Sequence, residues 1–445
     1  MTCIIAGIAM DEPETRLPYL AAETPAVPGA IKTFEEDFRV EEIPAYLPGG
    51  KGDHTYLLIE KRGISTTAAV RAVARELGVR PRNVGFAGRK DARGVTRQLI
   101  SVEHLDPSRA AAIDLPRVRV IEAERHGNKL RLGHLRGNRF ALRLRETDPS
   151  RAGEVRAALA EMGCRGAPNY FGYQRYGIRG DTWEIGRAAL RGDYRLAAEL
   201  IAGDPRPGDA PGALRARELF AAGRLEDAAR AWPRGFQDNA RVARELARPA
   251  RDPRRAVLSL DRRALGLYAS AYQSRLFDRV LAARIAELDR VEEGDVAWKH
   301  DSGAQFVVED PREEQPRADR FEISAAGPLF GRKMKRARGR PAEIEREVLA
   351  QEGIEAEFFP SSGPLRCSGA RRPLRMRPRE VAVEAGSDER GEYIELRFAL
   401  DPGCYATSLL REICKDDLEI TPRISSPGSS RSANRSERPA GGTRS

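Results

Sequence analysis

The chain has 445 residues, of which 41% are hydrophobic, and a formal net charge of +10 at pH 7. This length is more than one hydrophobic core usually serves, so two or three domains are expected. The excess of Lys and Arg favours a polyanionic partner, with nucleic acid the first candidate. The apolar run at residues 3–10 is too short to cross a bilayer and follows no basic region, so neither a membrane span nor a signal peptide is expected.

The five cysteines and five histidines are scattered along the chain and form no CxxC or HxxxH pattern. Disulfides and structural zinc are therefore not expected, and a reducing cytoplasm fits the composition. The segment 327–333, GPLFGRK, superficially suggests a phosphate loop, but it lacks the required spacing and the following Ser or Thr.

Residues 1–29 are rich in Pro, Glu and Ala and show little periodicity, which predicts an arm lying on the surface. The runs 38–43 and 54–60 alternate apolar and polar side chains, as half-buried strands do. Ser65 can cap the amphipathic helix that follows and runs to about Leu77.

The segment 85–102, GFAGRKDARGVTRQLISV, is typical of two strands joined by a tight connection. Gly88 and Gly94 bracket the connection and allow backbone conformations that other residues resist. Asp91 is its only carboxylate and stands among several cations, so it is expected to be ionised and able to act as a nucleophile or a general base. A Lys-Asp pair at a hairpin tip is usually a solvated turn, and it is the later motifs that favour chemistry.

Three runs between residues 117 and 145 alternate Val, Leu or Phe with Arg or Lys: 117–120, 129–132 and 139–145. Alternation places the cations of each run on one face. Three such strands side by side would form a basic surface suited to a phosphate backbone. A solvated face of mixed charge is the alternative.

Residues 168–177, PNYFGYQRYG, hold four aromatic side chains within seven residues, together with Asn, Gln and Arg. Aromatic faces stack on bases, and side-chain amides read base edges. A buried aromatic turn is the alternative.

From about residue 183 the sequence becomes helical in pattern and rich in Ala, Arg and Leu, with a long helix expected over 265–288 and another over 341–351. Strand-like alternation returns at 394–400, followed by a short helix over 406–413 that is expected to pack on the first sheet. The first domain is therefore expected to be interrupted and then completed by the later segment. After residue 417 almost no apolar side chains remain, which predicts a disordered tail.

Four segments together resemble the TruD family of tRNA pseudouridine synthases. They are KTFEEDFRVEE at 32–42, FAGRKDARGVTRQ at 86–98, NYFGYQRYG at 169–177 and GCYATSLLRE at 403–412. The segments occur in the family's order and at compatible spacing, and the likeness runs over roughly residues 16–416.

The resemblance implies an α+β fold, in which a pseudouridine-synthase catalytic domain with a mixed, mainly antiparallel sheet and helices is interrupted by an inserted α/β domain, the TRUD domain. The extra length near residues 203–255 makes this insertion longer than in compact members. The limits expected are an N-terminal arm over 1–29, the catalytic domain over 30–189 and 369–416, the insertion over 190–368, and the tail over 417–445.

The resemblance also implies an RNA-modifying isomerase that converts uridine to pseudouridine, with the uridine at position 13 of tRNA as the usual target. It implies a cytoplasmic, RNA-binding enzyme of tRNA processing that needs no cofactor, metal, membrane or obligate protein partner. By matching motif positions, Asp91 is the expected catalytic aspartate and Lys32 its partner. Phe38 is expected to stack near the target base, and Asn169 and Phe171 to hold the flipped nucleotide.

Two other functions stay open. One is an RNA-binding module without chemistry, such as a chaperone or assembly factor. The other is a glycoside-hydrolase-like enzyme acting through paired acids, which would need a second carboxylate such as Glu41 or Glu42 within several ångströms of Asp91.

Overall fold

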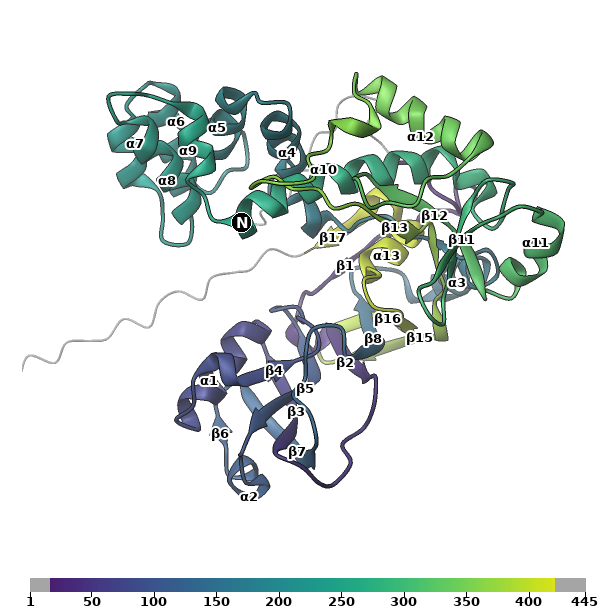
Figure 1. Ribbon diagram of the computed structural model, residues 1–445. Helices are drawn as coiled ribbons and strands as arrows, with labels where there is room; N and C mark the ends of the chain where they lie inside the picture. The colour runs from purple at the N-terminus through teal and green to yellow at the C-terminus, as the bar shows by residue number, and fades with distance from the viewer. Residues whose placement is uncertain (1–16, 421–445) are drawn as a thin grey trace, which may run out of the picture.

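The structure is a computed structural model that describes residues 17–420 (Figure 1). Most of the predicted arm, residues 1–16, and the predicted tail from residue 421 onward lie outside the described residues. The described chain divides into a part built on a large sheet and a part dominated by helices α4–α12, which Figure 1 shows above that sheet.

The large sheet has nine strands within residues 17–420, in the order β15-β16-β8-β2-β5-β3-β7-β6, with β4 beside β5. All neighbours are antiparallel except β2 and β5, which run parallel. The predicted mixed, mainly antiparallel sheet is therefore confirmed. Its strands are β2 (Phe38–Pro44), β3 (His54–Arg62), β4 (Val84–Phe86), β5 (Val95–Glu103), β6 (Asp114–Leu115), β7 (Val118–His126), β8 (Leu135–Leu144), β15 (Arg379–Asp388) and β16 (Gly391–Leu400).

Helices cover one face of this sheet and form two separate cores with it. Helix α1 packs through Val70 on the β3 and β5 side, whereas α3 and α13 pack through Leu159 and Leu409 on the β8 and β16 side. The predicted cap of α1 is confirmed, because the Ser65 hydroxyl accepts a hydrogen bond from Ala68 N at 3.2 Å. The helices of this part are α1 (Thr66–Glu76), α2 (Pro107–Ala111), α3 (Ala152–Arg165) and α13 (Ala406–Cys414).

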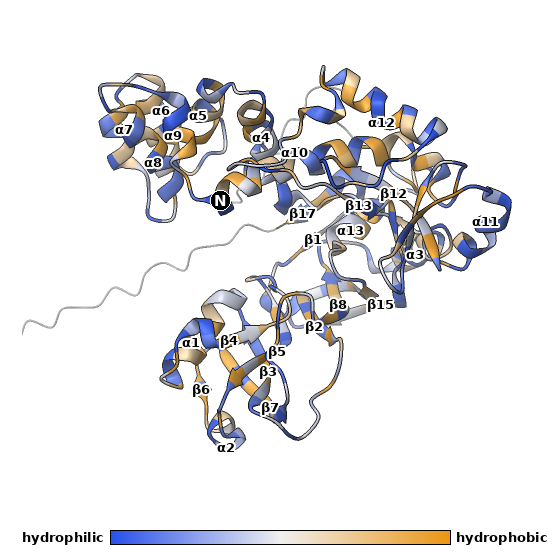
Figure 2. Ribbon diagram, viewed as in Figure 1, coloured by the Kyte–Doolittle hydropathy of each residue, from blue (hydrophilic) through white to orange (hydrophobic). Residues whose placement is uncertain are grey.

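The helical part, which holds the expected insertion together with the flanking elements α4 and β13, contains a helical bundle and a small antiparallel sheet in the order β11-β10-β12-β13. Hydrophobic residues lie on the inner faces of its helices, whereas α11 is almost uniformly hydrophilic (Figure 2). The elements are α4 (Thr182–Leu190), α5 (Tyr194–Ala202), α6 (Pro211–Ala221), α7 (Leu225–Ala231), α8 (Gln237–Leu246), α9 (Pro253–Leu258), α10 (Arg262–Ala283), α11 (Pro311–Asp319), α12 (Gly339–Gln351), β10 (Val296–Lys299), β11 (Gln305–Val307), β12 (Ile323–Leu329) and β13 (Ala370–Pro373). The predicted long helix is confirmed as α10, although it ends at Ala283 and not at 288.

Two elements join the insertion to the catalytic part. Helix α4 packs with the insertion through Ile185 and Ala189, which belong to its buried cluster. Strand β13 pairs with β12, whereas the next strand, β14 (Arg375–Met376), pairs with β9 (Ala167–Pro168) just before the aromatic segment. The strand that leads into the aromatic segment, β9, is thus paired with the first strand after β13.

The two ends of the described chain meet in a parallel pair, β1 (Gly29–Ile31) with β17 (Leu418–Ile420). Upstream of β1, Val27 is buried in the α3–α13 core, and Leu20 N donates a hydrogen bond to Glu412 at 2.8 Å. Residues 17–29 therefore differ from a surface arm, because Val27 is buried and Leu17 and Leu20 pack against buried clusters. Likewise, β17 lies within the range for which the sequence predicts a tail.

The prediction of a basic surface made from three adjacent ribbons is wrong. Residues 129–132 form no strand: Leu130 is buried, and its N–H donates to the Ser101 hydroxyl at 2.9 Å. The other two ribbons became β7 and β8, which are separated by β3, β5 and β2. Arg145 in the third run is itself buried, between Asp37 and Asp388, and so is not part of an open basic face.

Candidate active site

Asp91 lies in the connection between β4 and β5, residues 87–94. Strand β4 pairs along its whole length with residues 100–102 at the end of β5, whereas the first part of β5 pairs with β2. The connection is therefore wider than the predicted tight turn. The Asp91 side chain is 32% exposed. Its Oδ2 accepts from Lys32 Nζ at 3.1 Å, and its Oδ1 accepts from Gln174 Nε2 at 3.3 Å. Three of the four sequence motifs therefore meet at one carboxylate.

Lys32 directly follows β1 and has a left-handed backbone, with φ of 59°. Its side chain is 4% exposed, and Nζ lies 4.1 Å from the centroid of the Phe38 ring. Arg93 Nη2 donates to the Lys32 carbonyl at 2.8 Å. Lys32 thus places a fixed positive charge directly against the Asp91 carboxylate.

Lys61 is a second cation of the site that the sequence analysis missed. It is completely buried, and its Nζ donates to the main-chain carbonyls of Asp91 at 2.6 Å and Ile64 at 2.7 Å. Burial lowers the pKa of Lys61 to about 8, although the Asp91 charge acts in the opposite direction. The sequence signal for Lys61 is the alternation of side chains along β3. Lys61 lies on the same face as the buried residues Leu57 and Ile59.

The underside of the connection is held by a second ion pair. Lys90 Nζ donates to Glu42 Oε2 at 2.5 Å, and Lys90 N donates to the Thr66 hydroxyl at 2.9 Å. Burial raises the pKa of Glu42, and the Lys90 charge opposes that shift. Glu42 is thus used within the core, and Glu41 points to the other face of β2, so neither provides the second acid that a paired-acid hydrolase needs.

Of the two bracketing glycines, only Gly94 has a left-handed φ, +135°. A Cβ at Gly94 would lie 2.2 Å from the Phe38 carbonyl oxygen. Close approach of the connection to β2 therefore requires glycine at this position.

The aromatic segment reaches Asp91 through η5 (Tyr173–Tyr176), which carries Gln174. Asn169, at the start of the segment, is 1% exposed. Its Nδ2 donates to Pro373 O at 2.9 Å, and its Oδ1 accepts from Arg372. Both ends of the amide are therefore engaged inside the protein, and the structure brings no atom of Asn169 into contact with Asp91.

Phe171 is half-buried, with the Arg372 guanidinium 4.4 Å from its centroid and the edge of Phe277 packed at 5.5 Å. Tyr405, which precedes α13, lies 6.1 Å from Phe171 between centroids and was not singled out from the sequence. Phe38, in contrast, is only 2% exposed and packs edge-on against Phe140. Of the two aromatics predicted to meet a base, Phe171 is the more accessible.

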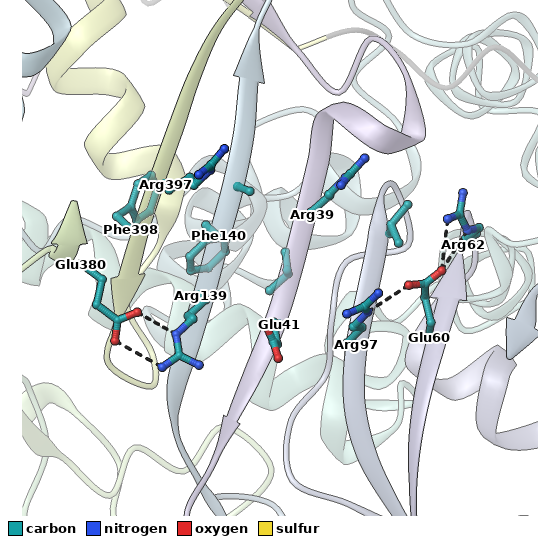
Figure 3. Close-up of a pocket in the computed structure, with 13 residues that line it drawn as sticks. Arg39, Glu41, Glu60, Arg62, Arg97, Arg139, Phe140, Glu380, Arg397 and Phe398 are labelled. Carbon is teal, nitrogen blue, oxygen red and sulfur yellow. Dashed lines mark hydrogen bonds and ion pairs between the residues drawn. The ribbon is translucent and has the colours of Figure 1, made fainter. Parts of the chain in front are cut away.

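A concavity of about 440 Å³ lies on the opposite face of the sheet (Figure 3). Arg39, Glu41 and Arg97 line it, and these alternate along their strands with residues of the Asp91 face. Figure 3 shows two of its ion pairs between strands, Arg97–Glu60 at 3.0 Å and Arg139–Glu380 at 2.7 Å, whereas Arg39 and Glu41 are drawn without a partner among the lining residues. This charged concavity is separate from Asp91.

Among residues 17–420, no group of three or more His, Cys, Asp or Glu side chains could hold a metal ion. No helix in that range is both long and apolar enough to span a membrane.

Comparison with known proteins decides the family. The family model of tRNA pseudouridine synthase D (TruD) matches residues 15–413. The chain belongs to the TruD family. Membership places it among isomerases, and the resemblance in the four segments is confirmed.

Its relatives span almost the whole chain. It is 47% identical over 408 residues to the tRNA pseudouridine synthase D of Geobacter sulfurreducens, covering 92% of this chain and 98% of that protein. It is 39% identical over 409 residues to the protein of the same name from Anaeromyxobacter dehalogenans, covering 91% and 99%. A crystal structure assigned to TruD of Methanosarcina mazei superimposes with a TM-score of 0.78 at 26% identity, covering 91% of this chain and 99% of that one.

Proposed function

We propose that this protein isomerises uridine to pseudouridine in tRNA, at the uridine of position 13, with Asp91 as the reacting group. The observation that carries the proposal is the convergence of three distant motifs on the Asp91 carboxylate, through Lys32 and Gln174. The names of the relatives support the same reaction on the same class of RNA.

The reaction breaks the bond between N1 and C1′, turns the uracil, and joins C5 to C1′; C5 loses a proton and N1 gains one. Asp91 serves this sequence either as a nucleophile at C1′ or C6 or as a base toward the ribose. In both roles the carboxylate must be ionised when the substrate arrives. Lys32 Nζ lies 3.1 Å from Asp91 Oδ2 and is proposed to orient the carboxylate toward the nucleotide.

The uridine must leave its stack to reach Asp91, which costs a few kcal/mol. Phe171 is proposed to offset that cost by stacking on the extruded base, a contact worth about 1–3 kcal/mol. Phe38 is proposed to act indirectly. Its buried ring packs against Lys32 Nζ, which in turn contacts Asp91. Asn169 is also proposed to act indirectly on the nucleotide. Its side-chain amide holds the Arg372 guanidinium and the Pro373 carbonyl in place.

The division into a catalytic domain over 30–189 and 369–416 with an insertion over 190–368 is also proposed. The separate buried clusters of the two parts support it, with α4 and β13 as the joining elements. A cytoplasmic location is proposed on the ground that tRNA is the substrate.

The test is pseudouridine formation on a tRNA transcript, mapped by carbodiimide modification. The protein should convert uridine 13, and a transcript with cytidine at that position should gain no pseudouridine. Asp91→Asn should lower the rate at least about a thousandfold, since it removes the charge but keeps the shape. Asp106→Asn is the matched control, because Asp106 caps α2 at the surface and Asn caps as well.

A wild-type protein that binds tRNA but leaves every uridine unmodified would support the module without chemistry. An Asp91→Asn variant as fast as the parent would refute the assigned role.

A further inference from the structure

A buried carboxylate of the insertion holds the aromatic segment from behind. Asp278 lies on α10 with no exposed surface. Its Oδ1 accepts from Phe171 N at 3.0 Å, and its Oδ2 accepts from the Tyr176 hydroxyl. One side chain thus joins the two ends of the stretch that presents Phe171 and Gln174.

Burying the Asp278 carboxylate costs free energy, and hydrogen bonds and nearby positive charges offset that cost. The neighbours of Asp278 on α10, Phe277 and Leu281, belong to a buried apolar cluster that also contains Tyr170. Burial raises the pKa of Asp278 to about 7, while the hydrogen bonds from Tyr176 and Phe171 N and the charges of Arg275 and Arg372 act in the opposite direction. A buried carboxylate without hydrogen-bond partners is strongly destabilising, so the two hydrogen bonds are needed.

The same face of α10 makes further contacts with the segment. Arg175 Nε donates to the Ser274 hydroxyl at 2.9 Å and Arg175 Nη2 to the Ser270 carbonyl at 3.3 Å. Phe277 packs edge-on against Phe171. Gln174, between these anchors, is the residue whose amide reaches Asp91 at 3.3 Å.

We propose that Asp278 is a positioning residue: it fixes residues 171–176 in the conformation that sets Gln174 against Asp91 and Phe171 beside the base. Helix α10 of the insertion thereby sets the geometry of a site whose reacting group belongs to the catalytic part. This inference rests on the proposed function, since its readout is pseudouridine formation.

The test compares Asp278→Ala with Asp278→Asn in the full-length protein. The alanine variant should lose 30-fold or more in kcat, with tRNA affinity in a filter assay within about threefold of wild type. The asparagine variant should recover to within about fivefold, because its Oδ1 can still accept from Phe171 N and its amide can donate to the Tyr176 oxygen. Tyr176→Phe, which removes only one of the two bonds, should fall between them.

Asp295 provides the control for lost stability. It is also a buried acid of the insertion, paired with Arg284 at 3.0 Å, but it does not contact the aromatic segment. Asp295→Ala should lower the melting temperature yet keep kcat at a temperature where it is folded.

The inference is overturned if Asp278→Ala keeps the wild-type kcat, or if Asp278→Asn is as impaired as Asp278→Ala. It is also overturned if Asp295→Ala loses kcat to the same degree as Asp278→Ala. If Asp278→Ala does not fold, an unchanged kcat in Tyr176→Phe overturns it. A wild-type protein inactive on every tRNA is a different result and refutes the proposed function.

Discussion

The Asp91 connection and the aromatic segment meet at one hydrogen bond, but they are held in opposite ways. The connection is fixed by cations: Lys32 on the carboxylate and Lys61 on the main-chain carbonyl. The aromatic segment is fixed by the buried carboxyl group of Asp278, 107 positions further along the chain than Phe171. The proposed reacting group is thus held by cations of the catalytic part, whereas the segment opposite it depends on a helix of the insertion.

Apart from replacing Asp91 itself, the largest effect expected from within the connection comes from Gly94→Ala. The new Cβ would meet the Phe38 carbonyl at 2.2 Å in a left-handed backbone, so the connection must shift away from β2. A shift of this order near the reacting group should lower kcat/KM about a hundredfold. Gly78→Ala is the control, since Gly78 is also left-handed, at φ +68°, but a Cβ there meets nothing within 4 Å. Equal losses in the two variants would mean that backbone strain and not the contact with Phe38 matters.

Lys61→Met should have the next largest effect. It removes the donor to two buried carbonyls, which should cost roughly 1–3 kcal/mol in the free energy of unfolding. The connection should then lose its preferred position, with kcat falling about tenfold and tRNA affinity unchanged. Urea denaturation and single-turnover assays measure the two quantities. Loss of stability without loss of kcat would show that Lys61 does not position Asp91.

These two sides of the site also differ in what the sequence reveals. The parity of β3 places Lys61 on a buried face, and the motif around Asp91 is continuous in the chain, so both can be found locally. Asp278 cannot be found in this way, because nothing in the pattern of α10 indicates which distant backbone N–H it will meet. The run 129–132 shows the opposite failure: its alternation is typical of a strand, but a hydrogen bond from Leu130 N to a side chain replaced the expected ladder.

The burial of predicted site residues was likewise beyond local pattern. Phe38 and Asn169 were expected to face a nucleotide, yet the structure buries both. Long-range contacts cause this burial, since Phe140 packs against Phe38 and Arg372 donates to the side-chain oxygen of Asn169.

A smaller effect, on stability as a function of pH, is expected from the buried carboxyl group of Asp278 and not from the cations that hold the connection. The pKa of Asp278 is raised from 3.8 to about 7, so the folded protein holds a proton that the unfolded chain releases between these values. Stability from this group is therefore complete below about pH 4 and is lost as pH rises through about 7. Relative to Asp278→Asn, wild type should lose up to roughly 1.4 kcal/mol per pH unit in that window. Denaturation at several pH values measures the difference, and parallel curves would show that Asp278 is not shifted.

The smallest effect is expected on the far face of the sheet. Arg97→Gln breaks an exposed pair with Glu60 within the concavity of Figure 3, which should change stability by less than about 1 kcal/mol. Pseudouridine formation and tRNA affinity should stay within twofold of wild type. A clear loss of affinity would mean that RNA also contacts this face.

The pairing of β1 with β17 has a consequence for how the enzyme comes into being. Lys32 directly follows β1, yet the strand that supports β1 is the last one described in the chain. Backbone hydrogen bonds between Ala30 and Arg145 hold the other side of β1. The two-sided support of the backbone just before Lys32 is therefore complete only once the two ends of residues 17–420 have come together.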